Sequence, residues 1–211
     1  MDGSNHNYEF TNDWFQAAAI KNWDSLVPQI KPSKILEVGS YEGASACYLI
    51  GKNEWHEDLE LFCIDTCEGG ITHKVANVNM DAVEQRFDHN ISVAQTESGK
   101  NISVRKMKGM SSDLMPKLIA NGHAGTFDFV YVDGSHEAPD VFLDAVLAFK
   151  LCKIGGLIAF DDYLWKENKP HGDDLTMSPK LAIDAFTNVF SRKLKIVPAP
   201  LYQLYVLKIA D

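Results

Sequence analysis

The sequence alternates five times between a short apolar run and a helix-like segment, and this alternation most constrains the fold. The apolar runs are residues 34–38, 59–64, 102–107, 127–132 and 157–160. After each run, apolar residues recur at helical spacing. Parallel strands need long crossover connections, which are usually right-handed and helical. We therefore expect a doubly wound, Rossmann-like α/β domain with helices on both faces of a largely parallel sheet.

The C-terminal region departs from this rhythm. After a predicted helix at 178–190, two strand-like runs at 194–198 and 202–208 are separated by only a few residues, Pro200 among them. Such a short link permits only an antiparallel pair. The prediction is a seven-stranded sheet, mostly parallel, with an antiparallel C-terminal hairpin strand.

The region before the first strand is predicted to be a helical extension. Thr11 is expected to cap a helix that breaks near Pro28 and Pro32. At this length we expect one domain, so the chain divides into an extension, residues 1–32, and a main domain, residues 33–211.

Charge and hydropathy narrow the class of partner. The net charge of -9 disfavours binding to a phosphate backbone. The N-terminus lacks the pattern of a secretion signal, and no run of 18 apolar residues occurs. We expect a cytoplasmic protein, alone or as a homo-oligomer, that acts on a small molecule and binds neither nucleic acid nor membrane.

Polar residues follow the predicted strands, at the sheet edge where ligands of open α/β folds bind. Gly39 and Gly43 form a turn after the first strand, and Asp65 closes the second. The glycines would let a ligand approach the backbone, and Asp65 could accept hydrogen bonds from a ribose. The glycine spacing departs from the dinucleotide fingerprint, which disfavours a nicotinamide enzyme. Taken alone, all three residues are equally compatible with ordinary turns.

An acidic cluster is the more specific signal. Asp133 ends the fourth strand, and Asp161 and Asp162 end the fifth. Three carboxylates brought together would repel one another, and a hard divalent cation such as Mg²⁺ would resolve this. The alternatives are a solvated turn or, for Asp133, a helix cap. His136 could face the same cavity as a general base, although a surface or capping role is also open.

Four segments carry a resemblance to a known family: I-L-E-V-G-S-Y-E-G-A-S, K-G-M-S-S-D-L-M-P-K-L, F-D-F-V-Y-V-D-G-S-H and G-G-L-I-A-F-D-D. With them the chain resembles class I S-adenosylmethionine-dependent methyltransferases, within these the catechol O-methyltransferase-like, metal-dependent enzymes that methylate small molecules. The D-G-S-H and F-D-D forms look closer to a bacterial branch that includes macrocin O-methyltransferase-like and cephalosporin-biosynthesis proteins.

The resemblance implies a role for each matching residue. It implies a cofactor-binding set that consists of Glu37, Gly39, Ser40, Tyr41, Ser45, Asp65, Met110, Ser111, Ser112 and Asp133. Within this set, the residues after the first strand surround the methionine part of S-adenosylmethionine, Asp65 holds the ribose and residues 110–112 edge the adenine. The implied ligands of Mg²⁺ or another divalent cation are Asp133, Asp161 and Asp162, and the implied catalytic residues are His136 and Asp133.

Two residues depart from the pattern of the family. His136 stands where many members have a catalytic lysine, and Asp162 stands where the third ligand is often Asn. The implied reaction is in-line transfer of the activated methyl group to a hydroxyl oxygen that the metal acidifies and His136 deprotonates. The alternatives are a metal-independent methyltransferase acting on nitrogen or carbon, a protein that binds the cofactor without methyl transfer, and a nicotinamide-dependent oxidoreductase.

Overall fold

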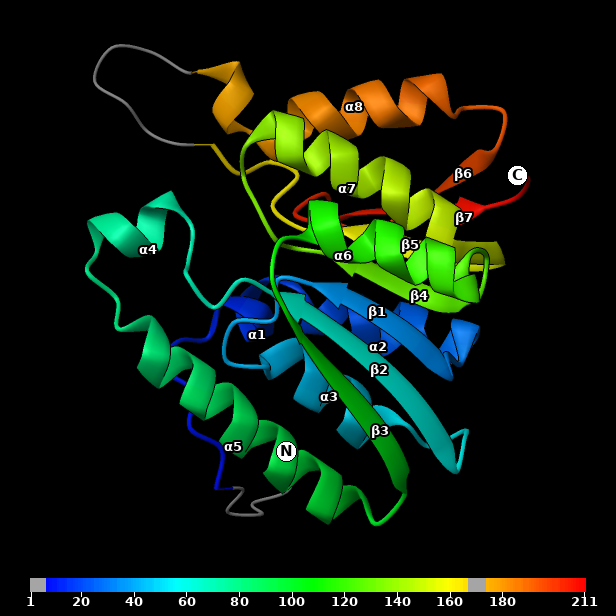
Figure 1. Cartoon of the computed structure of the whole chain (residues 1–211). Helices are drawn as coiled ribbons and strands as arrows, with labels where there is room; N and C mark the ends of the chain where they lie inside the picture. Colours follow the sequence, from blue (N-terminus) through cyan, green and yellow to red (C-terminus); the bar gives the residue numbers. More distant parts are fainter. Residues whose placement is uncertain (1–6, 167–173) are drawn as a thin grey trace.

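The computed structural model describes residues 7–166 and 174–211, and its centre is a seven-stranded sheet in the order β3-β2-β1-β4-β5-β7-β6 (Figure 1). The strands are β1 (Lys34–Val38), β2 (Asp58–Asp65), β3 (Asn101–Lys108), β4 (Phe127–Val132), β5 (Cys152–Phe160), β6 (Leu194–Val197) and β7 (Leu204–Lys208). Neighbours among the first five strands are parallel, whereas β7 is antiparallel to both β5 and β6. The predicted fold class is confirmed.

Helices cover both faces of the sheet (Figure 1). One face carries α6 (Ser111–Leu118), α7 (Ala138–Leu151) and α8 (Pro179–Val189), and the other carries α2 (Ile20–Ile30), α3 (Ala44–Lys52) and α5 (Met80–Ser98). The shorter elements are α1 (Trp14–Ala18), α4 (Ile71–Val75), a π-helical turn (Ile119–His123) and a 3₁₀ turn (Leu175–Met177). None of the described helices is long and apolar enough to cross a lipid bilayer.

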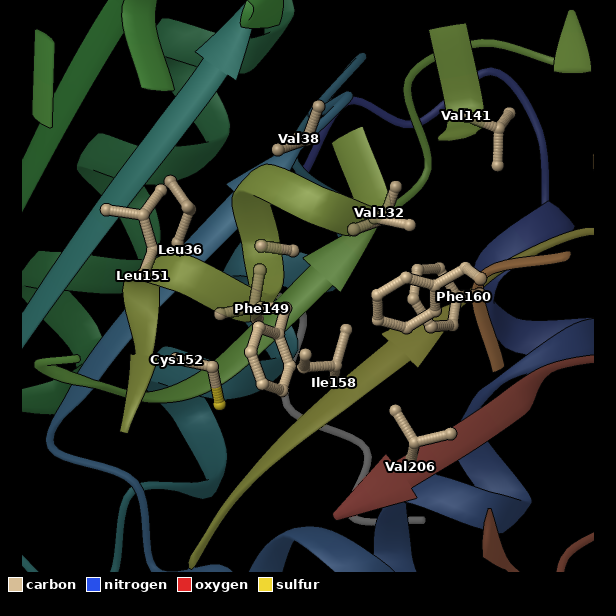
Figure 2. Packing of buried hydrophobic residues seen from close by; sticks show 14 of the residues in the cluster. Leu36, Val38, Val132, Val141, Phe149, Leu151, Cys152, Ile158, Phe160 and Val206 are labelled. Atoms are coloured by element: carbon tan, nitrogen blue, oxygen red, sulfur yellow. The ribbon is translucent and has the colours of Figure 1, made fainter. Parts of the chain in front are cut away.

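Strand periodicity divides the core into two layers. Leu36 and Val38 of β1 face α6, α7 and α8, while Ile35 belongs to the layer under α2, α3 and α5. Successive strand side chains point to opposite faces, so a strand covered on both sides is apolar throughout. Phe149 of α7 and Ile158 of β5 are fully buried in the first layer (Figure 2). The sheet is therefore a rigid platform for the loops that follow its strands.

The reversal of strand order lies between β1 and β4, which are neighbours in the middle of the sheet. Hydrogen bonds between strands continue past the strand ends: Asp133 N donates to Val38 O (2.7 Å), and Asp161 N donates to Val132 O (3.0 Å). The loops after β4 and β5 thus begin in fixed register with their neighbours. Ligands of such folds bind at this position.

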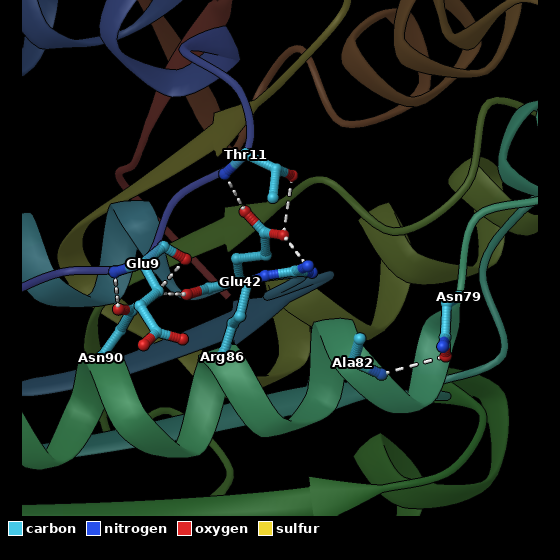
Figure 3. A network of polar contacts seen from close by, with 7 residues as sticks. All are labelled: Glu9, Thr11, Glu42, Asn79, Ala82, Arg86 and Asn90. Atoms are coloured by element: carbon cyan, nitrogen blue, oxygen red, sulfur yellow. Dashed lines mark hydrogen bonds and ion pairs between the residues drawn. The ribbon is translucent and has the colours of Figure 1, made fainter.

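A buried carboxylate attaches the N-terminal segment to this edge of the sheet (Figure 3). Glu42 accepts hydrogen bonds from the amide and the hydroxyl of Thr11 (2.7 and 2.8 Å) and from Arg86 of α5 (3.0 Å). Asn90, also on α5, bonds the backbone of Glu9 and the carbonyl oxygen of Glu42. The chain before α1 is therefore anchored by polar contacts to α5 and to the turn that follows β1.

One prediction about the N-terminal helices is wrong, and the break expected near Pro28 and Pro32 falls after Ile30, between the two prolines. Asp13 occupies the N-cap position of α1, and the Thr11 side chain makes the contact described above instead of capping the helix. The second helix is not broken at Pro28 but continues through it to Ile30. Trp23 and Val27 of this helix are buried, and their packing outweighs the backbone hydrogen bond that proline removes.

The fifth strand begins earlier than predicted. Gly155 and Gly156, expected to precede it, lie inside β5, where the register with β4 shifts between Phe127 and Phe129. Glycine inside a strand commonly marks such an irregularity. The C-terminal half of β5, which leads to the acidic cluster, lies where the sequence predicts it.

Candidate active site

A strained turn follows β1 and brings it close to the end of β4. Gly39 has φ +87°, and a Cβ added there would lie 2.0 Å from the carbonyl oxygen of Asp133. No other residue fits without separating the two strand ends. Tyr41 and Gly43 of the same turn also have positive φ, 46° and 81°. The turn therefore places the start of α3 directly beside the loop after β4.

The residues around this turn leave buried polar atoms without partners. Glu37 is fully buried, and its Oε1 accepts a hydrogen bond from the Ser45 hydroxyl. Its Oε2 and the hydroxyl of Ser40 have no hydrogen-bond partner among the described residues. Burial raises the pKa of the Glu37 carboxyl. Unpaired buried polar atoms are costly, and a polar ligand at this turn would satisfy them.

Asp65, at the end of β2, supports the same turn. Its Oδ2 accepts hydrogen bonds from the amides of Ser40 and Tyr41 (2.9 Å each), and its Oδ1 accepts one from the amide of Cys67 (2.7 Å). A carboxylate offers about four acceptor positions. Three of these positions accept hydrogen bonds from backbone amides, which hold the turn in place. Asp65 can therefore accept one further hydrogen bond.

The three acidic residues meet as predicted from the strand ends. Asp133, Asp161 and Asp162 each offer a carboxylate oxygen, and these atoms lie within 4.8 Å of one another. Burial raises the pKa of Asp133, and the charges of Asp161 and Asp162 raise it further. Burial and the charge of Asp162 raise the pKa of Asp161 to about 6. This concentration of half-buried negative charge favours either proton uptake or a cation.

His136 lies beside this cluster. Its Nε2 is 2.8 Å from Oδ2 of Asp162, and its ring centroid is 4.1 Å from that of Trp165. Asp162 itself has φ +52°, an unfavourable backbone conformation for a residue with a side chain. The loop after β5 is thus bent so that Asp162 and Trp165 enclose the imidazole.

The remaining predicted residues follow β3. Gly109 N donates to Asp65 O (2.9 Å), which joins the loop after β3 to the end of β2. Met110, half exposed, precedes α6, and Ser111 and Ser112 form its first turn. Since β3 pairs with β2, these residues flank Asp65. Two strands, β2 and β1, separate β3 from β4, where the acidic cluster begins.

An aromatic group lies over the Gly39 turn and includes a histidine to which the sequence gives no role. His73 of α4 stacks on Tyr41 (centroids 5.1 Å apart), and Trp14 contacts both rings (5.5 and 6.0 Å). The Nε2 of His73 is buried without a hydrogen-bond partner among the described residues, and burial lowers the pKa of the imidazole. Trp14 and Tyr41 also border a groove of about 350 Å³ with Arg86.

From the sequence, the aromatic residues of 1–20 and 163–176 could form a lid and wall for an acceptor, or equally could be packing or an oligomer contact, and in the structure they divide in two. Trp14 and Trp165 lie at the crevice, whereas Phe15 packs inward against Trp23 (4.9 Å). His171, also considered for this wall, lies outside the described residues. Two residues that the sequence analysis missed contact the acidic cluster, Tyr131 and Gln203, and no motif in the sequence marks either one.

Comparisons with known proteins agree with this architecture. A family model described as a methyltransferase domain matches residues 36–163, more than half of the chain. A Dictyostelium discoideum protein named probable caffeoyl-CoA O-methyltransferase 3 is 28% identical over 143 residues, which cover 66% of this chain and 47% of that protein. The chain spans about half the length of the curated relatives it matches.

Solved structures share the fold. The O-methyltransferase TomG of Streptomyces achromogenes, in complex with S-adenosylmethionine, has a TM-score of 0.61 at 19% identity, covering 90% of this chain and 79% of that one. An O-methyltransferase of Bacillus cereus in complex with S-adenosylhomocysteine has a TM-score of 0.59 at 18% identity, covering 97% and 84%. With its strand order, its Gly39 turn and the matching family model, this chain belongs to the family of methyltransferase domains.

Proposed function

We propose that this chain transfers the methyl group of S-adenosylmethionine to a hydroxyl oxygen of a small molecule, with a divalent cation bound at the acidic cluster. One observation carries the proposal: Gly39 lies against Asp133, so the turn that would bind the methyl donor is adjacent to the carboxylates that would bind the cation. Family membership and relatives named as O-methyltransferases support it.

The residues after β1 fit the methyl donor. The donor carries a charged amino-acid end, and Glu37 Oε2 and the Ser40 hydroxyl are buried polar atoms that lack partners. Tyr41 and Ser45 complete this part of the proposed site. Asp65 has one free acceptor position for a ribose hydroxyl, and Met110, Ser111 and Ser112 would border the adenine. Catalysis here consists of holding the sulfonium methyl in line with the acceptor oxygen.

The acidic cluster fits a hard divalent cation. Its donors are carboxylate oxygens from Asp133, Asp161 and Asp162, the ligand type that Mg²⁺ prefers. When bound, such a cation would lower the pKa of a coordinated hydroxyl and so produce a better nucleophile at neutral pH. The three carboxylates would hold it beside the Gly39 turn, which places the acceptor next to the methyl donor.

His136 is the proposed proton acceptor. Asp162 holds its Nε2, and Trp165 packs against its ring, so the imidazole has a fixed orientation at the edge of the cluster. The acceptor's hydroxyl proton would pass to the imidazole as the oxygen attacks. A general base at this position adds about 100- to 10,000-fold to the rate.

Calorimetric titration tests the proposal. S-adenosylmethionine is titrated into the native protein, Asp65→Ala and Asp161→Ala, each with and without Mg²⁺. We expect Asp65→Ala to weaken cofactor binding at least tenfold, because the amides of Ser40, Tyr41 and Cys67 lose the carboxylate that accepts their hydrogen bonds. We expect Asp161→Ala to bind the cofactor but to lose Mg²⁺ uptake. Asp58→Asn, at the opposite end of β2, is the control and should match the native protein.

The two variants test separate parts of the proposal. Native affinity in Asp65→Ala would remove the ribose assignment. Normal Mg²⁺ uptake in Asp161→Ala would remove the cation site and leave a metal-independent transfer. Tight cofactor binding without turnover on any hydroxylated acceptor would favour a binding protein of the same fold.

A further inference from the structure

Gln203 connects the acidic cluster to the interior of the protein. It directly precedes β7 and is 1% exposed. Its Nε2 donates to Oδ1 of Asp161 at 2.6 Å and lies 3.4 Å from the hydroxyl oxygen of Tyr131. Its Oε1 accepts hydrogen bonds from Nε1 of Trp23 (3.0 Å) and from the hydroxyl of Tyr205. Every polar atom of the side chain is thus engaged.

Trp23 fixes which end of the amide faces Asp161. The indole nitrogen can only donate, so it must meet the amide oxygen, and the amide nitrogen is left to point at the carboxylate. Trp23 is itself immobilised, since it is fully buried on α2 and packs edge-on against Phe129 and Tyr131 (5.1 and 4.8 Å between centroids). The donor to Asp161 therefore has a defined orientation before any ligand arrives.

A second branch of hydrogen bonds reaches the carboxylate of Asp133. The hydroxyl of Tyr131 donates to Oδ2 of Asp133 at 3.1 Å, which leaves its lone pairs to accept from Gln203. The donors run in one direction, from Trp23 to Gln203 and then to Asp161 directly and to Asp133 through Tyr131. Gln203 and Tyr131 thus hold both carboxylates of the cluster, and the backbone amide of Asp162 also donates to Asp161.

We propose that Gln203 is a positioning residue that orients Asp161 and Asp133 for cation binding, an inference that rests on the cation site of the proposed function. Carboxylates that ligate a metal are commonly oriented by further hydrogen bonds, and removing such a partner weakens metal affinity by about 10- to 100-fold. In this chain the hydrogen-bond partner of the carboxylate is Gln203 of the C-terminal hairpin, which is itself held by Trp23 of α2. The cation site thus depends on two segments that contribute no ligand.

Binding of Mn²⁺ to the protein alone, followed by electron paramagnetic resonance, tests this role. Gln203→Met keeps the length of the side chain but cannot donate, and we expect it to bind Mn²⁺ about 10- to 100-fold more weakly than the native protein. Tyr131→Phe removes the donor to Asp133 and leaves Gln203 in place, and it should weaken binding in the same direction.

Tyr205→Phe is the matched control. It removes the hydroxyl that donates to Gln203 Oε1, in the same buried cluster, and no hydrogen bond joins this hydroxyl to Asp133 or Asp161 among the described residues. We expect it to lose thermal stability while its Mn²⁺ affinity stays within about twofold of the native value. A role of Gln203 in folding alone would instead lower the melting temperature of both variants without separating their affinities.

The outcomes distinguish this inference from the proposed function. If the native protein binds Mn²⁺ and folded Gln203→Met binds it equally well, the inference is overturned and the cation site stands. If Gln203→Met does not fold, native affinity in Tyr131→Phe overturns it. If the native protein itself takes up no Mn²⁺, the cation site and the inference both fall, while binding of S-adenosylmethionine is measured independently.

Discussion

At the residue scale, the site depends on a glycine, Gly39, at the end of β1. Gly39 allows the end of β1 to touch the backbone of Asp133, and its φ of +87° is one that residues with a side chain rarely adopt. Asp65 then fixes the turn by accepting the amides of Ser40 and Tyr41. The proposed donor and cation sites are adjacent because these backbone contacts hold.

Gly39→Ala is expected to disrupt this contact. The added methyl group would lie 2.0 Å from a carbonyl oxygen, so β1 and β4 must separate at their ends. We predict at least a tenfold loss of affinity for S-adenosylmethionine and a lower melting temperature. The control is Gly51→Ala in α3, where a Cβ meets no atom within 4 Å, and alanine there should stabilise the helix by up to about 1 kcal/mol.

Asp144 provides a pH test. It is 2% exposed on α7, and burial, with a smaller effect from the charge of Asp140, raises its pKa from 3.8 to about 6. A carboxyl whose pKa is higher in the folded state binds more protons there, so folding stability falls as pH rises from about 4 to about 6. Asp144→Asn removes this dependence.

Chemical denaturation at several pH values measures the effect. The free energy of unfolding of Asp144→Asn minus that of the native protein should be near zero at pH 4. This difference should rise to about 3 kcal/mol above pH 6, since each pKa unit corresponds to about 1.4 kcal/mol. The difference between the two proteins isolates Asp144 from other buried acids. A flat profile for Asp144→Asn would contradict the assignment.

Single residues differ in how far the sequence predicts them. Asp133, Asp161 and Asp162 end apolar runs, so a strand prediction alone brings them to one edge of the sheet. Gln203 and His73 follow no such rule, because their roles depend on contacts with residues far away in the chain. Nothing in the local sequence distinguishes the buried Gln203 from a glutamine on the surface.

At the element scale, the segment before α1 is held to α5 and to the turn after β1 through Glu42 (Figure 3). Glu42 is 2% exposed and receives hydrogen bonds from Thr11 and from the charged side chain of Arg86. Hydrogen bonds to charged groups contribute about 1.5–3 kcal/mol. These contacts keep Trp14 against Tyr41 at the mouth of the groove.

Glu42→Gln should loosen this segment while the sheet stays folded. Removing the charge weakens the hydrogen bonds to Thr11 and Arg86. If the segment loses about 1–2 kcal/mol of local stability, its open state becomes about 5- to 30-fold more populated. Hydrogen–deuterium exchange over residues 8–18 measures it, with Glu57→Gln, exposed at the opposite edge of the sheet, as control. Unchanged exchange in this segment would show that apolar packing alone holds it.

The order of elements was predictable, but part of their arrangement was not. Apolar runs predict all seven strands, and the short link between the last two predicts their antiparallel pairing. The insertion of β7 between β5 and β6 is set by packing across the whole sheet. Likewise, the burial of Trp23 carries α2 through Pro28, which local propensity predicts as a break.

At the scale of the whole molecule, distant segments converge on one crevice. The turn after β1 supplies the proposed donor site, and the loops after β4 and β5 supply the acidic cluster. Gln203, before β7, donates to Asp161 of this cluster and accepts a hydrogen bond from Trp23 of α2. With this arrangement, S-adenosylmethionine and the cation would be neighbours when both are bound.

Nuclear magnetic resonance of S-adenosylmethionine labelled with ¹³C in its methyl group, with Mn²⁺ as a paramagnetic probe, tests this directly. Bound Mn²⁺ should broaden the methyl signal of the protein-bound cofactor strongly, and Asp161→Ala, which keeps the cofactor but loses the cation, should show no broadening. A methyl signal left sharp while the native protein holds both ligands would place the two sites apart and contradict the account.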